Sequence, residues 1–157
     1  MARVLVTGMS GTGKSTALGE LAQLGFRTVD TDEGGWSSWS ESDGGYVWNE
    51  ERISELLAAE TDAGLYVSGT VSNQGRFYPR FDAIVLLSAP PDVLLSRLAR
   101  RTNNSYGKSR EERELILRQV AEVEPRLRRA CTHEIDATQP IDDVVAALIE
   151  IATAGGT

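Results

Sequence analysis

Hydrophobic and polar positions along the chain predict short strands that alternate with helices. The apolar run 3–7 stops at a glycine and has the length of a buried strand, and helically spaced leucines follow over 14–24. A second strand is expected over 26–29, and runs 65–68 and 83–87 have the composition of further buried strands. This alternation predicts a mainly parallel sheet with helices on both faces.

Caps, stops and apolar stripes predict the remaining elements. These are a helix over about 50–60 capped by Asn49, a helix beginning at Pro90-Pro91, a helix beginning at the Ser109/Glu112 capping box, a strand near 133–135 and a helix over about 142–151. Pro125 is expected to kink or end the third of these elements. Residues 30–45 are rich in Gly, Ser and Asp without a sustained period, and they are expected to form a loop.

Size and charge narrow the class of protein. The 157 residues are expected to form one domain over 1–157, and the net charge of −7 argues against nucleic-acid or membrane-surface partners. The apolar runs are too short for a signal peptide or a membrane span. Cys131 is the single cysteine, so no internal disulfide can form, and a cytoplasmic location is expected.

Charge is distributed unevenly along the chain. Residues 97–129 contain ten Lys or Arg and five Asp or Glu, whereas residues 30–62 contain ten acids and one base, Arg52. The first segment therefore suits a phosphate-bearing ligand, and the second favours a neutral or cationic one.

The strongest motif is Gly8-Met-Ser-Gly-Thr-Gly-Lys14-Ser15, a complete phosphate-binding loop between a predicted strand and a predicted helix. Its glycines let backbone N–H groups turn inward at a helix N-terminus, where they bind anions. Lys14 can reach the β- and γ-phosphates of a nucleotide, and the Ser15 hydroxyl is a ligand for Mg²⁺. The alternative is a glycine turn that binds nothing. The predicted nucleotide-binding residues are Gly8, Ser10, Gly11, Thr12, Gly13, Lys14, Ser15 and Thr16.

Two carboxylates, Asp30 and Asp32, stand where the second predicted strand ends. Ligands of parallel α/β sheets bind outside the carboxyl ends of the strands, so both carboxylates are expected to face the same crevice as the phosphate loop. One could hold Mg²⁺ through water, and the other could accept a proton from an attacking hydroxyl. The alternative is that both are solvated turn residues.

The acidic segment is also rich in large aromatic residues. Trp36, Trp39 and Trp48 lie within thirteen positions of one another, together with Tyr46. They are interpreted either as walls of a ligand site or as a small core beneath a long connection. The candidate acceptor-binding residues are Asp32, Trp36, Trp48, Arg52 and Arg76.

A basic run, Arg97-Leu-Ala-Arg-Arg101, ends directly before a predicted short lid at about 102–110. From that position Arg101 could close over a phosphate as it is transferred. Arg97 is interpreted as a solvated helix end.

Taken together, the phosphate loop, the D-T-D sequence of residues 30–32, the R-L-x-x-R run and the chain length resemble the small P-loop kinases of the nucleoside monophosphate kinase fold. Asp30-Thr-Asp32 looks like the D-x-D of shikimate kinase, which implies that Asp30 serves Mg²⁺ and Asp32 grips the acceptor hydroxyl. Residues 43–57 are similar to the acceptor region of short-lid adenylate kinases related to Fap7. The resemblance implies a three-layer α/β/α P-loop NTPase fold, with a five-stranded parallel sheet in the order 2-3-1-4-5 and adenine near residues 137–140.

Two departures from these families bear on the substrate. The third predicted strand ends Val67-Ser-Gly-Thr70 without the aspartate of the adenylate kinase branch, which leaves the metal to Asp30 or Asp32. The lid also lacks the later arginine of shikimate kinases, so shikimate is not the expected acceptor.

These features predict an ATP- and Mg²⁺-dependent kinase that phosphorylates a small-molecule hydroxyl. Its catalytic residues would be Lys14, Asp32 and Arg101, its metal ligands Ser15 and Asp30, and its acceptor neutral or cationic. Two alternatives stay open: a nucleoside monophosphate kinase relying on Arg52, Arg76 or Arg80, and an ATPase that acts as a switch or assembly factor. The chain is expected to be a monomer or a homodimer.

Overall fold

The computed structural model describes residues 2–59, 64–100 and 110–155. Its central feature is a five-stranded parallel sheet in the order β2-β5-β1-β6-β7. Counted along the chain, these parallel strands have the order 2-3-1-4-5, which confirms the order implied by the resemblance. The strands are β1 (Arg3–Thr7), β2 (Arg27–Asp30), β5 (Leu65–Ser68), β6 (Ala83–Ser88) and β7 (His133–Asp136).

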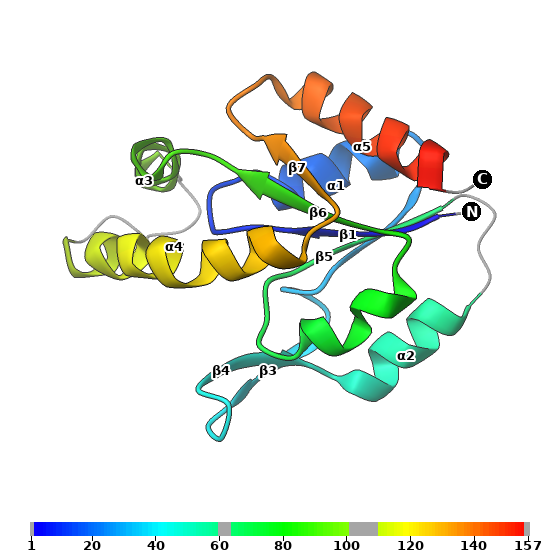
Figure 1. Cartoon of the computed structure of the whole chain (residues 1–157), viewed down its shortest axis with the longest axis horizontal. Helices are drawn as coiled ribbons and strands as arrows, with labels where there is room; N and C mark the ends of the chain where they lie inside the picture. Colours follow the sequence, from blue (N-terminus) through cyan, green and yellow to red (C-terminus); the bar gives the residue numbers. More distant parts are fainter. Residues whose placement is uncertain (1, 60–63, 101–109, 156–157) are drawn as a thin grey trace.

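Helices cover both faces of this sheet, giving the predicted three-layer α/β/α arrangement (Figure 1). One face carries α1 (Lys14–Gln23) and α5 (Ile141–Gly155), and the opposite face carries α2 (Glu50–Ala58) and the short 3-10 helix Gln74–Arg80. Helix α3 (Pro91–Ala99) follows β6, and α4 (Arg110–Ala130) leads into β7.

Alternation along the strands divides the buried side chains between two cores. Val4 and Val6 on β1 pack with the α1 and α5 side, whereas Leu5 packs with Ile53 and its neighbours on α2. The predicted cap of α2 is present, because the Asn49 side chain accepts a hydrogen bond from the Arg52 backbone N–H at 3.2 Å.

Residues 30–45 are not a plain loop, contrary to the prediction. The chain forms an antiparallel hairpin from β3 (Ser37–Ser40) and β4 (Gly45–Trp48), which projects from the body of the molecule (Figure 1). Gly44, with a φ of 70°, closes the turn, and Trp39 pairs directly with Tyr46 across the strands. Cross-strand pairing of this kind stabilises strands that serine-rich sequence does not signal.

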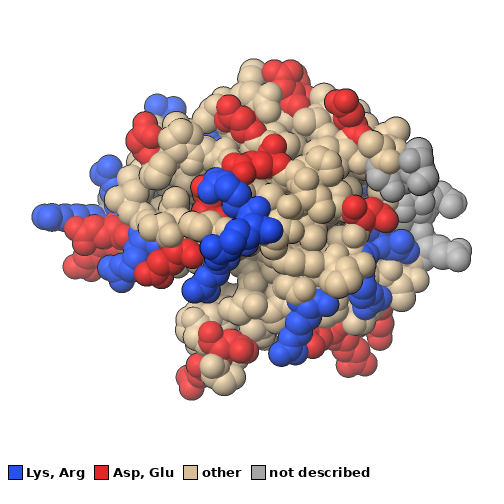
Figure 2. All heavy atoms as spheres, viewed as in Figure 1, with Lys and Arg blue, Asp and Glu red and all other residues tan. Residues whose placement is uncertain are grey.

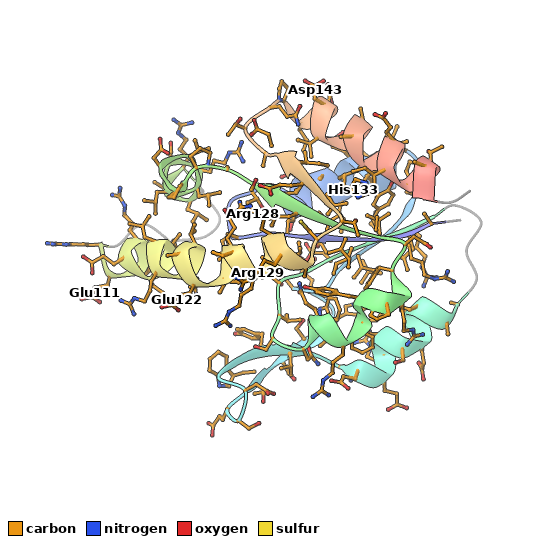
Figure 3. The ribbon with its side chains drawn as sticks, viewed as in Figure 1. Glu111, Glu122, Arg128, Arg129, His133 and Asp143 are labelled. Carbon is orange, nitrogen blue, oxygen red and sulfur yellow. The ribbon has the colours of Figure 1, made fainter. Side chains whose placement is uncertain are left out.

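Helix α4 does not end at Pro125, where the sequence led us to expect a kink or a stop. It continues to Ala130. The turn beyond the proline is anchored by buried Leu127 and by Arg128, which donates to Glu124 and to Glu134 at 2.9 Å each. Figure 3 shows Arg128 at this end of α4. These contacts offset the backbone hydrogen bond that proline cannot donate.

Within residues 2–59, 64–100 and 110–155, no helix combines the length and the apolar character needed to cross a membrane.

Candidate active site

The phosphate-binding loop joins β1 to α1 at the carboxyl end of the sheet, as its sequence context predicts. Gly8, Gly11 and Gly13 all have positive φ values, of 151°, 89° and 93°. A Cβ atom on Gly8 would collide with the carbonyl oxygen of Leu87, and one on Gly11 would lie 3.2 Å from that of Leu94. Glycine at these positions therefore permits both the loop conformation and its close packing on the next elements.

Lys14 lies across this loop. Its ammonium group donates hydrogen bonds to the carbonyl oxygens of Gly8, at 2.6 Å, and Met9, at 3.1 Å. The Thr12 hydroxyl, which is buried, also donates to Met9, at 2.9 Å, whereas Ser10 is exposed. The Lys14 and Thr12 side chains thus hold the loop through its carbonyl oxygens, and a positive charge lies beside the loop backbone.

The hydroxyl of Ser15 meets the first carboxylate of the D-T-D turn. It donates to Asp30 Oδ2 at 2.6 Å. The sheet register explains this contact, since Asp30 on β2 and Val6 on β1 both pair with Ser68 of the intervening β5. The sequence prediction that the phosphate loop lies beside these carboxylates is thus confirmed for Ser15 and Asp30.

Hydroxyl and carboxylate oxygens are the ligands that Mg²⁺ prefers, and this ion commonly takes only one or two protein ligands, with water and phosphate oxygens completing its coordination. Ser15 and Asp30 fit that requirement. No group of three or more His, Cys, Asp or Glu side chains suited to a metal occurs among the residues described.

Asp32 stands beside this pair. Its backbone N–H donates to Asp30 Oδ1 at 3.1 Å. Although Asp32 retains exposed surface, protein atoms around its carboxyl reduce its hydration and raise its pKa; the Asp30 carboxylate raises the pKa further, and the Lys14 ammonium lowers it. Asp32 is therefore the carboxyl of the turn whose affinity for a proton is increased.

A chain of side-chain hydrogen bonds supports the loop from the neighbouring strand. Thr70 donates to the Gly8 carbonyl oxygen at 2.6 Å and accepts from the Gly8 N–H at 3.2 Å. Thr7 and Thr70 hydroxyls lie 3.1 Å apart, and the Gln74 amide donates to Thr7 at 3.1 Å. Because the proton of Thr70 is committed to Gly8, Thr7 donates to Thr70.

Thr7, Thr70 and Gln74 were not among the predicted site residues. The signal that could have found the two threonines is their position, since each is a polar residue at or just beyond the carboxyl end of a buried strand.

A cavity of about 270 Å³ opens beside the phosphate loop. Arg97 spans it, donating to the carbonyl oxygens of Gly11, at 3.1 Å, and Ala137, at 2.5 Å. The interpretation of Arg97 as a solvated helix end is therefore wrong. The lining residues are Gly11, Thr12, Gly13, Thr16, Arg97, Ala137, Gln139, Ile141 and Val144.

The helical spacing around Arg97 could have predicted that this side chain does not simply extend into solvent. Arg97 follows Leu94 by three positions and directly precedes Leu98, and both leucines are fully buried. A residue so placed lies at the edge of the buried helix face. Arg101 and residues 102–109 of the predicted lid fall outside the described residues.

The tryptophans have different environments. Trp48 is 2% exposed, its indole N–H donates to the Thr31 hydroxyl at 2.8 Å, and its ring packs on Phe77. Trp48 is thus a core residue, and our expectation that it contacts the acceptor is wrong because almost none of its surface is open. Trp36 is partly buried, with the Arg52 guanidinium 4.1 Å above its ring.

The arginines of the predicted acceptor region contact protein groups. Arg52 donates to the Gly34 carbonyl oxygen at 2.9 Å, and Arg76 pairs with Glu50 at 3.1 Å. The Arg76 side chain is 74% exposed, so its geometry is that of an outward-facing surface pair.

Comparison with known proteins agrees with this geometry. Residues 4–118 match the AAA domain family. Shikimate kinase 2 of Yersinia enterocolitica is 31% identical to this chain, over 94% of each protein, and that of Sodalis glossinidius is 29% identical over 94% of this chain and 93% of the relative. The chain belongs to the AAA domain family, as a small P-loop kinase of shikimate and gluconate kinase type.

Solved structures show the same fold in more distant kinases. Shikimate kinase from Acinetobacter baumannii, in complex with shikimate, superposes with a TM-score of 0.66 at 17% identity, covering 98% of this chain and 94% of the other. Shikimate kinase from Bacteroides thetaiotaomicron gives a TM-score of 0.67 at 20% identity, covering 96% and 97%. These structures show the shared fold. The family match and the two relatives, about 30% identical over most of the chain, show a P-loop kinase with a nucleotide substrate and a small-molecule hydroxyl acceptor.

Proposed function

We propose that this kinase transfers the γ-phosphate of ATP, with Mg²⁺, to a hydroxyl group of a neutral or cationic small molecule. The observation that carries the proposal is the contact between the phosphate loop and the D-T-D turn, in which Ser15 donates to Asp30 at 2.6 Å. Through it, the residues suited to the triphosphate, the metal and the acceptor hydroxyl come together at one edge of the sheet.

ATP would lie with its triphosphate on the loop formed by Gly8, Ser10, Gly11, Thr12, Gly13, Lys14, Ser15 and Thr16. The cavity spanned by Arg97 adjoins this loop and includes Ala137 and Gln139, which fits a purine base there. Lys14 would exchange its carbonyl partners for phosphate oxygens and offset the charge that develops during transfer. Arg101 would add a second positive charge from the lid.

Mg²⁺, when bound by Ser15 and Asp30, neutralises phosphate charge. Ser15 would turn its hydroxyl oxygen from Asp30 to the ion. The protein contributes two oxygen ligands, and the remaining positions are left for phosphate and water.

Asp32 would act on the acceptor. The acceptor oxygen attacks the γ-phosphorus and the bond from that phosphorus to the bridging oxygen of ADP breaks, while the hydroxyl proton passes to the Asp32 carboxylate and then to water. The raised pKa of Asp32 supports this role, because it strengthens the carboxylate as a base.

Charge in the acceptor region supports a neutral or cationic acceptor. Shikimate carries a carboxylate, whereas the arginines described in this region have other partners: Arg52 binds the Gly34 carbonyl, Arg76 binds Glu50, and Arg80 binds Ser54. Asp30 and Asp32 add negative charge. We therefore propose an acceptor other than shikimate, for which Trp36 and Arg52 form part of the surrounding wall.

The Lys14→Ala substitution tests the nucleotide site. We expect ADP production to fall about a hundredfold or more, because a charge that stabilises the transition state is removed. Thermal stabilisation by Mg²⁺-ATP should also be lost. Arg27→Ala, at the exposed start of β2, is the matched control and should behave as the unsubstituted protein.

The same assay separates a kinase from an ATPase. ADP production should rise strongly when a hydroxyl acceptor is added. Rapid ADP production that no acceptor stimulates would instead favour a nucleotide-hydrolysing switch, and unchanged behaviour of Lys14→Ala would remove the phosphate-loop assignment.

A further inference from the structure

The β3–β4 hairpin holds two large aromatic side chains in solvent. Trp39 and Tyr46 are each 58% exposed, and their rings meet edge to face with centroids 5.4 Å apart. Trp48, on the same hairpin, is by contrast 2% exposed. An exposed aromatic pair offers apolar surface that a ligand or partner can cover.

The strand register shows which way this pair points. Side chains two positions apart on a strand share a face, so Trp39 and Tyr46 lie on the face that also carries Ser37 and Trp48. Ser37 donates to the Thr31 carbonyl oxygen and Trp48 donates to the Thr31 hydroxyl, both at 2.8 Å. The aromatic pair therefore lies on the hairpin face turned toward Thr31, the residue between the two aspartates.

Distance along the strand suits a small ligand. Two residues of extended chain span about 7 Å, so the aromatic pair stands about that far along the hairpin from the Ser37 and Trp48 pair that contacts the D-T-D turn. This separation is of the size of one six-membered ring with its substituents. A molecule on the aromatic pair could thus present a hydroxyl toward Asp32.

The hairpin is held firmly in this position. The Asn73 side chain accepts from the Trp48 backbone N–H at 2.8 Å and donates to the Trp48 carbonyl oxygen at 3.1 Å. The Ser72 N–H donates to the carbonyl oxygen of Tyr46 at 3.0 Å. These bonds occupy the outer edge of β4, so the aromatic pair and the aspartates are preorganised relative to one another.

The charge around the hairpin narrows the class of ligand that the aromatic pair can bind. Glu33 precedes the hairpin, and Glu41 and Asp43 lie at its turn. Figure 2 shows acidic side chains at this end of the molecule and an indented surface between the hairpin and the basic side chains of α4. Carboxylates beside aromatic faces suit a ring that offers C–H groups to the aromatics and hydroxyl or amino groups to the acids.

We propose that Trp39 and Tyr46 form a platform on which the acceptor ring rests while its hydroxyl faces Asp32, so that the acceptor is a hydroxylated ring compound, neutral or amino-bearing. This inference rests on the proposed kinase function and narrows its substrate class to sugars, cyclitols and nucleosides. Trp39 and Tyr46 are binding residues in this scheme and take no part in proton transfer.

Kinetics with defined probes tests the platform. ADP production is measured with myo-inositol, glucosamine and uridine as ring probes, and with gluconate as an open-chain probe. With the ring probe that stimulates most, Trp39→Ala and Tyr46→Ala should each raise the acceptor KM about tenfold, because a stacking face is lost. The kcat and the KM for ATP should change by less than about twofold.

Two matched variants separate stacking from folding. Trp39→Phe keeps an aromatic face and should retain the acceptor KM. In the unsubstituted protein, tryptophan fluorescence should change when the ring probe binds, and in Trp39→Phe this change should be lost. Ser38→Ala lies on the opposite face of the same strand and should leave the KM unchanged.

Each outcome has a defined meaning. Stimulation by gluconate alone, or by none of the ring probes, overturns the platform inference; the nucleotide site stands if Mg²⁺-ATP still stabilises the protein through Lys14. An unchanged acceptor KM in Trp39→Ala and Tyr46→Ala overturns it too. Loss of nucleotide binding altogether in the unsubstituted protein removes the proposed function, and the inference falls with it.

Discussion

Asp30 and Asp32 stand two positions apart and have different environments. Asp30 accepts hydrogen bonds from the Ser15 hydroxyl and from the Asp32 N–H. Asp32 has a pKa raised above its ordinary value of 3.8 by lost hydration and by the charge of Asp30. The sequence identifies the pair, but it cannot assign the two roles, because hydration and neighbouring charge depend on the surrounding fold.

The pH dependence of catalysis follows from this difference. A proton acceptor works only when ionised, so kcat/KM should fall as pH decreases through the raised pKa of Asp32, earlier than an ordinary aspartate would allow. Asp32→Asn should lower kcat about a hundredfold or more and leave the KM for ATP nearly unchanged. Equal losses in kcat and in ATP affinity would instead make Asp32 a metal partner.

The same shift affects stability, with a defined sign. A raised pKa means that folding favours the protonated carboxyl, so ionisation of Asp32 lowers the stability of the folded state as pH rises through the interval above 3.8. Asp32→Asn should therefore have a Tm at neutral pH equal to or above that of the unsubstituted protein, and this difference should close in acid. A lower Tm at neutral pH would contradict the assignment.

At the scale of elements, the hairpin is the structure that sequence patterns failed to predict. Strand and helix limits marked by glycine, proline or a cap were predicted well, as with β1, α2 and α3. The hairpin was missed because its strands depend on pairing between residues 37–40 and 45–48 and on the Asn73 side chain at their edge. Of the two outcomes expected at Pro125, a kink or a stop, the stop does not occur, since contacts of the following turn hold α4 together.

Trp48 joins the hairpin to the main sheet, and its replacement should lower stability. Trp48→Ala is expected to reduce the free energy of unfolding by about 3–5 kcal/mol, because a large side chain that is 2% exposed is removed from the core beside Phe77. Urea unfolding measures this loss. Trp48→Phe keeps a smaller aromatic ring in the core and should cost less, with about 1–3 kcal/mol for the lost hydrogen bond to Thr31.

The ATP affinity of folded Trp48→Ala distinguishes a structural role from a ligand role. We expect this affinity to stay close to that of the unsubstituted protein below the melting transition. A large rise in the acceptor KM without any loss of stability would return Trp48 to the ligand site.

At the scale of the molecule, Arg97 links parts that are far apart in sequence. From α3 it bonds Gly11 in the phosphate loop and Ala137 after β7, across 86 and 40 positions. These segments meet because β1, β6 and β7 are neighbours in the sheet. The cavity beside the loop therefore depends on three separate segments that one guanidinium connects.

Arg97→Ala should weaken ATP binding about tenfold or more, because two hydrogen bonds that fix the cavity are lost at once. Calorimetric titration with Mg²⁺-ATP measures the change. Arg97→Lys should recover only part of it, since a single ammonium cannot reproduce the planar fork. Arg100→Ala, exposed at the end of the same helix, is the control. An equal loss of ATP affinity in Arg100→Ala would mean that the positive charge near the site matters and the two hydrogen bonds of Arg97 do not.

By itself, the sequence determined the features that depend on neighbours along the chain. The phosphate loop, the carboxylate pair, the caps and the alternation of strands and helices are local patterns, in which backbone conformation and burial follow from residue type and spacing. The family resemblance added the strand order, which the sheet of this protein confirms.

Only the tertiary structure decided which side chains meet. It placed Trp48 in the core and Trp39 in solvent, gave Arg97 its two distant partners, and set Thr70 beneath Gly8. The physical reason is that burial, hydrogen bonding and pKa depend on groups brought together from distant parts of the chain, and no local pattern records those groups.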